Sequence, residues 1–207
     1  MARNTALLVL LTLAGAATNA AAQATGTPSF NAPYRAFERH EFGGAISFND
    51  FDAGTALEAV YRFASGEFDV GLRGGFLFSR PLGQDEAFLA GAEGRYRVIT
   101  HSVDFPLDGA LIFGGGLSID GGTNFQFPFG LSLGRRVDVQ DSQVSIVPYV
   151  QPTLFILNQD LGLVRDTDIA FAVGVGGDFR LSRRFDARVS LGFGDLEGIS
   201  IAAVWVR

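Results

Sequence analysis

The 207-residue sequence contains no cysteine and no lysine, and it has only two histidines and one tryptophan. Without cysteine, the chain forms neither a disulfide framework nor a thiolate metal site. All 16 basic residues are arginines, and the formal net charge is −6. An acidic chain without a basic cluster is poorly suited to neutralising nucleic-acid phosphates, so we expect no nucleic-acid partner.

The sequence also lacks an apolar run that would cross a bilayer as a helix, which needs about 20 residues. The apolar run at 6–17, ALLVLLTLAGAA, follows Arg3 and precedes small residues at Ala20, Ala22 and Ala24. A basic start, a short apolar core and an A-x-A pattern are typical of a secretory signal peptide. We therefore predict a signal peptide over residues 1–22, with cleavage after Ala22 or Ala24, and a flexible segment over residues 23–35.

From about residue 36 onward, apolar and polar residues alternate. The stretch FQFPFGLSLGRR, residues 125–136, has Phe or Leu at each odd position up to 133 and Gln, Pro, Gly or Ser between them. Such alternation is typical of a strand with two unlike faces. Short turn sequences separate the runs, which predicts antiparallel neighbours in one barrel domain over residues 36–207. The ten runs lie at about 36–48, 55–64, 67–79, 86–99, 106–119, 123–137, 143–157, 167–181, 184–194 and 197–206.

Two all-β architectures fit this pattern. A soluble sandwich or barrel directs its apolar face inward, whereas a membrane barrel directs it outward. The polar face consists largely of Gly, Ala and Ser, which weaken a water-exposed strand but fit the narrow interior of a barrel. We therefore predict a closed antiparallel transmembrane β-barrel, an up-and-down meander of ten strands, with eight strands as the alternative. A soluble secreted β-barrel that binds an apolar ligand is a further alternative.

Arginines and carboxylates share the face that carries the small residues. An arginine facing lipid at the membrane midplane costs about 2–4 kcal/mol, which favours placing these charges in the lumen. We therefore predict a lumenal ion-pair network that constricts the periplasmic half, below a water-filled cavity open to the outside. By position in the pattern, the network comprises Arg62, Asp69, Arg73, Glu93, Arg95, Arg97, Asp108, Arg136, Asp178, Arg180, Asp186 and Arg188, with Arg39, Glu41 and Glu58 on the same face.

Aromatic residues on the apolar face gather near the strand ends. Two aromatic girdles at the membrane interfaces are typical of membrane barrels. The predicted girdle residues are Tyr61, Phe68, Tyr96, Phe125, Phe127, Phe171, Phe185, Phe193 and Trp205.

In its strand pattern and girdles the sequence resembles the small outer-membrane β-barrel proteins of Gram-negative bacteria, over nearly all of residues 36–207. Members of that family usually end on an aromatic residue, whereas this chain ends IAAVWVR, with Trp205 two places before the end. The resemblance implies an outer-membrane location after export and contact with membrane lipid and lipopolysaccharide. It also implies assembly with the help of periplasmic chaperones and the barrel-assembly machinery.

The sequence favours a non-enzymatic barrel that is structural or forms a narrow passive channel for small solutes. His40 and His101 fall near the predicted periplasmic end, and Ser102 directly follows His101. Neighbours on a strand point to opposite faces, so this pair forms no catalytic dyad, and we expect neither a catalytic residue nor a cofactor. Ca²⁺ or Mg²⁺ binding by the carboxylates of the outer loops is an alternative.

Three prolines interrupt two neighbouring runs of the pattern: Pro128, Pro148 and Pro152. Each proline removes a backbone hydrogen-bond donor from the sheet. We expect Pro128 and Pro152 to lie at similar depth. We expect a tolerated bulge at these prolines, and a lateral gate for lipid binding or lipid modification is the alternative.

Overall fold

The chain folds into β-strands joined by short connections. The structure is a computed structural model that describes residues 24–33, 39–50, 54–79, 86–120, 122–140, 142–160 and 165–207, with only the backbone described at 79, 159, 160, 165 and 166. The strands are β1 (Glu41–Asn49), β2 (Gly54–Ser65), β3 (Phe68–Ser79), β4 (Glu86–Ile99), β5 (Asp108–Ile119), β6 (Thr123–Gly134), β7 (Val137–Asp138), β8 (Ser145–Asp160), β9 (Arg165–Arg180), β10 (Phe185–Gly194) and β11 (Gly198–Val206).

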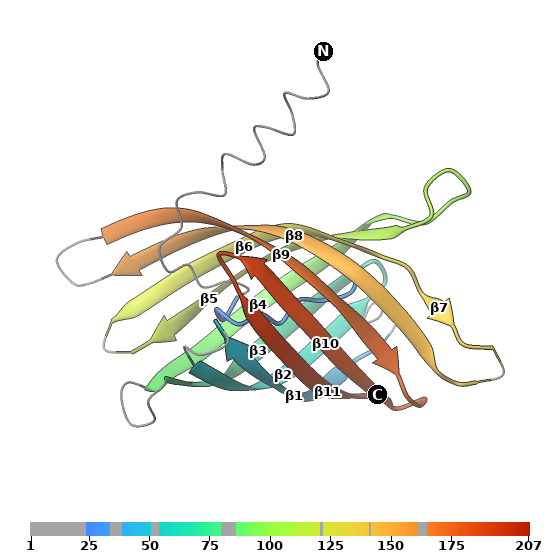
Figure 1. Ribbon diagram of the computed structural model, residues 1–207, viewed down its shortest axis with the longest axis horizontal. Helices are drawn as coiled ribbons and strands as arrows, with labels where there is room; N and C mark the ends of the chain where they lie inside the picture. The colour runs from blue at the N-terminus through green and yellow to red at the C-terminus, as the bar shows by residue number, and fades with distance from the viewer. Residues whose placement is uncertain are drawn as a thin grey trace, which may run out of the picture.

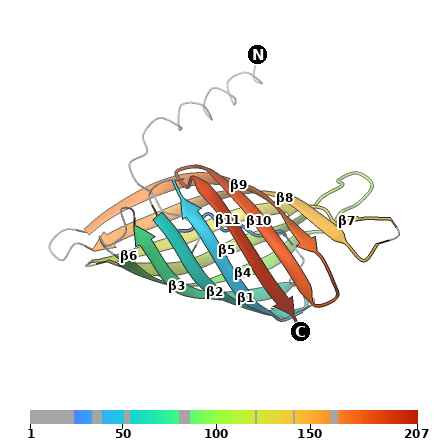
Figure 2. The ribbon, with the colours of Figure 1, turned by 60° about the horizontal axis from the view of Figure 1, so that its bottom comes forward.

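The strands close into a single antiparallel barrel (Figures 1 and 2). Neighbours along the chain pair with one another, β1 pairs with β11, and β6 pairs with β8. The two-residue strand β7 pairs only with β8, beyond the end of β6, so ten strands form the circumference. The predicted all-β, ten-stranded up-and-down barrel is confirmed, and the eight-stranded alternative is wrong.

The two ends of the barrel are distinguished by the chain ends. We call the end where β1 begins and β11 finishes the proximal end, and the opposite end the distal end. Connections at both ends are short, from the two residues between β2 and β3 to the eight between β4 and β5, both at the proximal end. Loop length therefore does not by itself distinguish the two ends.

The outward face of the barrel is apolar and the inward face is polar. Along β6, the side chains of Phe125, Phe127 and Phe129 are 38 %, 47 % and 57 % exposed, whereas Gln126 and Ser132 are buried. The phenylalanines thus point away from the barrel interior, as the alternation predicts for a membrane barrel. Eight of the nine predicted girdle residues are exposed on this outward face; Phe185 is half-buried, with its ring 5.2 Å from that of Trp205.

Residues 24–33 lie inside the barrel, where Figure 1 shows them in blue. All of them are buried except the half-buried Ser29. The sequence predicts a flexible segment over 23–35. The structure differs because lumenal side chains bond backbone groups of Gly26, Phe30, Asn31 and Ala32. The predicted signal peptide, residues 1–22, lies outside the described residues.

No helix among the described residues is long and apolar enough to cross a membrane.

Candidate functional site

The lumenal segment, residues 24–33, occupies space that glycines of the wall leave open. A Cβ atom added at Gly174 would lie 2.1 Å from Cγ of Phe30, and one added at Gly91 would lie 2.8 Å from the carbonyl oxygen of Ala24. At Gly116 the added Cβ would lie only 1.5 Å from the same Ala24 oxygen. The bare backbone at these positions therefore allows the segment to lie directly against the wall.

Glu58 of β2 joins the first half of the segment to the wall. Its Oε1 accepts a 2.6 Å hydrogen bond from the Thr25 hydroxyl, and its Oε2 accepts one of 2.9 Å from Thr27. Arg73 of β3 pairs with Oε2 of the same carboxylate at 2.8 Å and also donates to the carbonyl oxygen of Ser29. One buried carboxylate thus receives two hydroxyls and a guanidinium, which offsets the cost of burying its charge.

Phe30 anchors the middle of the segment in an apolar pocket. Its ring belongs to a buried cluster that includes Val147, Phe155 and Leu196. Its backbone is also bonded, because the Tyr149 hydroxyl donates to the Phe30 carbonyl oxygen at 2.8 Å. The segment therefore supplies part of the barrel's own core.

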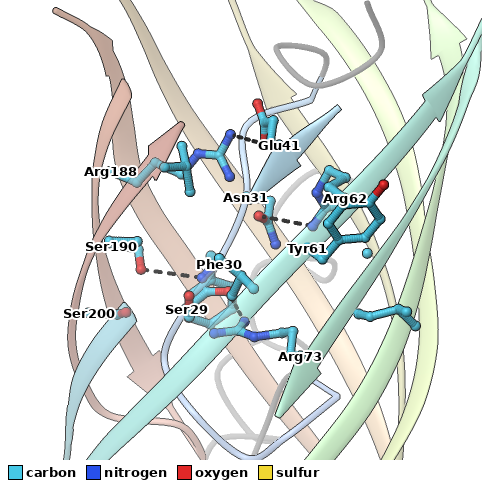
Figure 3. Close-up of a pocket in the computed structure, with 15 residues that line it drawn as sticks. Ser29, Phe30, Asn31, Glu41, Tyr61, Arg62, Arg73, Arg188, Ser190 and Ser200 are labelled. Carbon is cyan, nitrogen blue, oxygen red and sulfur yellow. Dashed lines mark hydrogen bonds and ion pairs between the residues drawn. The ribbon is translucent and has the colours of Figure 1, made fainter. Parts of the chain in front are cut away.

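Asn31 bridges four strands of the wall from inside, and its Oδ1 accepts a 3.4 Å hydrogen bond from Arg62 of β2 (Figure 3). Its backbone N–H donates to Oε1 of Gln151 on β8 at 3.1 Å, and its carbonyl oxygen accepts from Ser132 on β6 at 2.7 Å. Its side-chain amide donates to Glu93 of β4 at 3.0 Å. The next carbonyl, that of Ala32, accepts a hydrogen bond from Arg95.

Ion pairs link neighbouring strands around the same lumen. Arg62 pairs with Asp69 and Glu93, and Arg95 pairs with Asp69 at 3.0 Å. Arg188 of β10 pairs with Glu41 of β1 at 2.6 Å and with Asp178 of the adjacent strand β9 at 3.1 Å, and Figure 3 shows the pair with Glu41. These side chains are nearly or fully buried, so each unpaired charge would carry a large desolvation cost.

The other predicted network residues are Arg97, Asp108, Arg136, Arg180 and Asp186. Arg180 and Asp186 approach to 3.8 Å, and Arg97 is half-buried where the register shifts between β4 and β5. Asp108 is buried at the proximal rim and pairs with His101 at 3.0 Å. The placement of Arg136 in the constriction is wrong. It pairs with Asp138 on the exposed extension, because β6 ends at Gly134 and the alternating pattern stops there.

Some free space remains beside the lumenal segment. A cavity of about 30 Å³ lies beside the lumenal segment, lined among others by Asn31, Arg62 and Arg188 (Figure 3). One water molecule needs about 10–15 Å³ by this measure, so the cavity holds very few waters. The sequence predicts a water-filled cavity open to the outside; the structure instead places residues 24–33 in the space that the glycines leave.

Backbone pairing is interrupted on both sides of β6. Between β5 and β6 the pairing omits the rows of Phe127 and Pro128, and between β6 and β8 it omits the rows of Gln151 and Pro152. Pro128 is paired with Phe155 of β8, and Pro152 lies three residues before Phe155 on the same strand. The two prolines therefore lie at similar depth, as predicted. Pro128 is buried, whereas Pro148 is exposed and Pro152 half-buried. The pairing of the barrel wall is therefore interrupted on both sides of β6.

His101 and Ser102, the histidine and serine that adjoin in the sequence, each have other hydrogen-bond partners. His101 is paired with Asp108, while the Ser102 hydroxyl accepts the N–H of Phe105 within the same loop. Among the described residues no three His, Asp or Glu side chains converge as a metal site. Asp52 and Asp85 of the acidic distal loops lie outside the described residues.

Comparison with known proteins finds resemblance at the level of fold. No protein-family model matches the sequence, and no curated protein matches it. A de novo designed transmembrane β-barrel is 12 % identical, with a TM-score of 0.38, over 82 % of this chain and 95 % of that one. Neisserial surface protein A (NspA) is 13 % identical, with a TM-score of 0.35, over 81 % of this chain and 94 % of that one. The function proposed below therefore rests on the residues of this chain.

The buried ion pairs predict a large difference between two aspartates. Replacing Asp69 with alanine leaves Arg62 and Arg95 short of a buried partner, and we expect a loss of about 3–5 kcal/mol in the free energy of unfolding. Asp138→Ala breaks the exposed pair with Arg136 and should cost less than about 1 kcal/mol. Denaturant unfolding of the refolded barrel, followed by Trp205 fluorescence, measures both. Equal losses for the two variants would contradict the structural role of the lumenal network.

Proposed function

We propose that this chain is a non-enzymatic outer-membrane β-barrel protein of Gram-negative bacteria whose lumen is closed by its own N-terminal segment. The observation that carries the proposal is the combination of an apolar outward face with a polar lumen filled by residues 24–33. The protein is exported by means of its signal peptide and assembled with periplasmic chaperones and the barrel-assembly machinery. In the membrane it contacts lipid and lipopolysaccharide.

The distribution of polarity supports a lipid surrounding. Large apolar side chains such as Leu72, Phe127 and Leu154 are about half exposed on the outward face, while buried arginines and carboxylates face the lumen. Closure of the sheet leaves no strand edge to face the lipid. In water, the same surface would be an extended apolar patch, which is an aggregation hazard.

The lumenal segment supports a barrel that is closed at rest. The segment makes hydrogen bonds to Glu58, Glu93, Arg73, Arg95, Tyr149, Gln151, Ser132 and Ser190, and so contacts most of the inner wall. A narrow passive path for small solutes then requires that the segment leave the lumen. In that open state the path would pass the paired arginines and carboxylates.

Conductance across a planar bilayer tests this proposal. We expect no steady conductance from the refolded wild-type barrel. In the double variant G91V with G174V, the new side chains would collide with Ala24 and Phe30 of the segment, and the nearest contacts include no wall atom. This variant should therefore release the segment and produce conductance steps. G44V with G74V is the matched control. It adds the same side chains on the outward face, where the nearest atom is 3.5 Å away, and should remain silent.

Two results would contradict the closed state. One is a large steady conductance in the wild-type protein. The other is silence of G91V with G174V in a sample that migrates as a folded, heat-modifiable barrel and whose N-terminal segment has become sensitive to protease.

A second candidate function, lipid binding or modification through a lateral opening, is favoured by the interruptions beside β6. At the rows where β6 and β8 lack backbone pairing, Ser132 and Gln151 both bond Asn31 of the lumenal segment. The segment therefore replaces part of the missing connection between the two strands. Movement of the segment would then weaken the wall at the place where lipid would enter.

Hydrogen exchange separates this candidate from a tolerated irregularity. We expect faster exchange in β6 than in β2 and β3, whose pairing runs unbroken through twelve rows. Replacing Ser132 with alanine and Gln151 with valine should accelerate exchange in β6 further. Ser47→Ala is the control, because Ser47 meets Ser200 across the continuous pairing of β1 and β11. Uniformly slow exchange in β6 in every variant would exclude the lateral opening.

A further inference from the structure

Four arginines meet at the proximal rim of the barrel. Arg39, Arg183, Arg184 and Arg207 line one surface hollow of about 570 Å³, together with Phe42, Trp205 and Val206. They come from three segments that backbone hydrogen bonds hold together. The N–H of Arg207 donates to the carbonyl oxygen of His40 at 2.9 Å, and the N–H of Val206 donates to the carbonyl oxygen of Arg184 at 3.0 Å.

These arginines differ from those of the lumen in their partners. Arg62 and Arg188 each pair with two carboxylates inside the barrel. None of the four rim arginines forms an ion pair with another described residue. The side-chain hydrogen bond found in the cluster is a 3.3 Å contact from Arg39 to the carbonyl oxygen of Arg183. The rim therefore gathers four guanidinium groups that have no carboxylate side chain as an ion-pair partner within the described part of the chain, and the terminal carboxylate of Arg207 offsets one of the four charges.

The hollow lies where the apolar outward face ends. Trp205 and Phe42 are about half exposed on that face, with ring centroids 6.1 Å apart. The Phe185 ring packs edge-on against Trp205 from the neighbouring strand. Aromatic residues of this kind lie at the level of lipid headgroups, so the guanidinium groups beside them are at the depth of lipid phosphates.

We propose that this rim binds the phosphate group of an anionic phospholipid in the leaflet that meets the proximal end of the barrel. Guanidinium groups bind phosphate oxygens through paired, charge-assisted hydrogen bonds. The aromatic side of the hollow contacts the acyl chains of the same molecule, which favours a lipid over a soluble anion. The proposal rests on the membrane location proposed above and adds a specific site and ligand class to it.

Trp205 makes the proposal directly measurable, because it is the single tryptophan of the chain and lines the hollow. The full barrel is refolded into phosphatidylcholine vesicles that contain the same small fraction of either brominated phosphatidylglycerol or brominated phosphatidylcholine. Bromine quenches tryptophan emission on contact. We expect stronger quenching by the phosphatidylglycerol, corresponding to a relative affinity of about fivefold for each arginine that contacts the phosphate.

Two double variants with equal loss of charge localise the effect. R183Q with R184Q removes two arginines of the hollow. The ratio of the affinity for phosphatidylglycerol to that for phosphatidylcholine should then fall towards one. R135Q with R136Q removes an adjacent pair at the same end that does not line this hollow. Arg136 lines a neighbouring hollow that includes Arg39 and Arg183, so the preference should fall less than in the first pair. Loss of preference in the control pair alone, or in both pairs equally, would overturn the assignment to this hollow.

The remaining outcomes separate this proposal from the membrane location. Equal quenching of the wild-type protein by both brominated lipids would overturn the phosphate site and leave the membrane barrel in place. Quenching by neither lipid would overturn both. Inorganic phosphate added to vesicles of phosphatidylcholine alone should leave Trp205 emission unchanged. A saturable change would assign the hollow to soluble phosphate and overturn the lipid assignment.

Discussion

Pairing of arginines with carboxylates inside the barrel is the constraint on which the rest of the structure depends. A buried guanidinium or carboxylate is tolerated only when its charge is met at short range, and Arg62, Asp69 and Glu93 meet this condition across β2, β3 and β4. These pairs fix which face of each strand turns inward. The apolar face must then turn outward, because a shift of one residue in register would exchange the two faces. The apolar exterior is thus a consequence of where the charges are neutralised.

The lumenal segment completes this interior. Glycine at positions such as 91 and 174 leaves more room than wall side chains fill, and residues 24–33 occupy it. The segment also supplies partners to wall groups, including the Oε1 oxygen of Glu58 through the Thr25 hydroxyl. Asn31 binds β6 and β8 where their pairing is interrupted, so the filling of the lumen and the integrity of the wall share the same contacts. This shared use relates the closed lumen to the proposed lateral opening.

Much of this arrangement follows from the sequence because the period of two is a local signal. It identified the strands, the outward phenylalanines of β6 and the inward face that carries the charges. Alternation does not show where a strand ends. It therefore places Arg136 on the inward face of β6, although β6 ends two residues earlier, at Gly134. Nor does it indicate pairing between residues far apart, such as Arg188 with Glu41. The lumenal segment was missed because TGTPSFNAP has no periodicity; the signal that pointed to it was the excess of glycine on the inward face.

We propose that the outward face meets lipid while the inward face is filled by the chain itself. Because the chain has no cysteine, single cysteines placed at 125–133 along β6 can each carry a spin label in vesicles. We predict that accessibility to oxygen, which partitions into lipid, alternates with a period of two and is highest at 125, 127 and 129. The inward positions 126 and 132 should remain inaccessible to a water-soluble nickel complex as well. High nickel accessibility at the odd positions, or at the inward ones, would contradict the account.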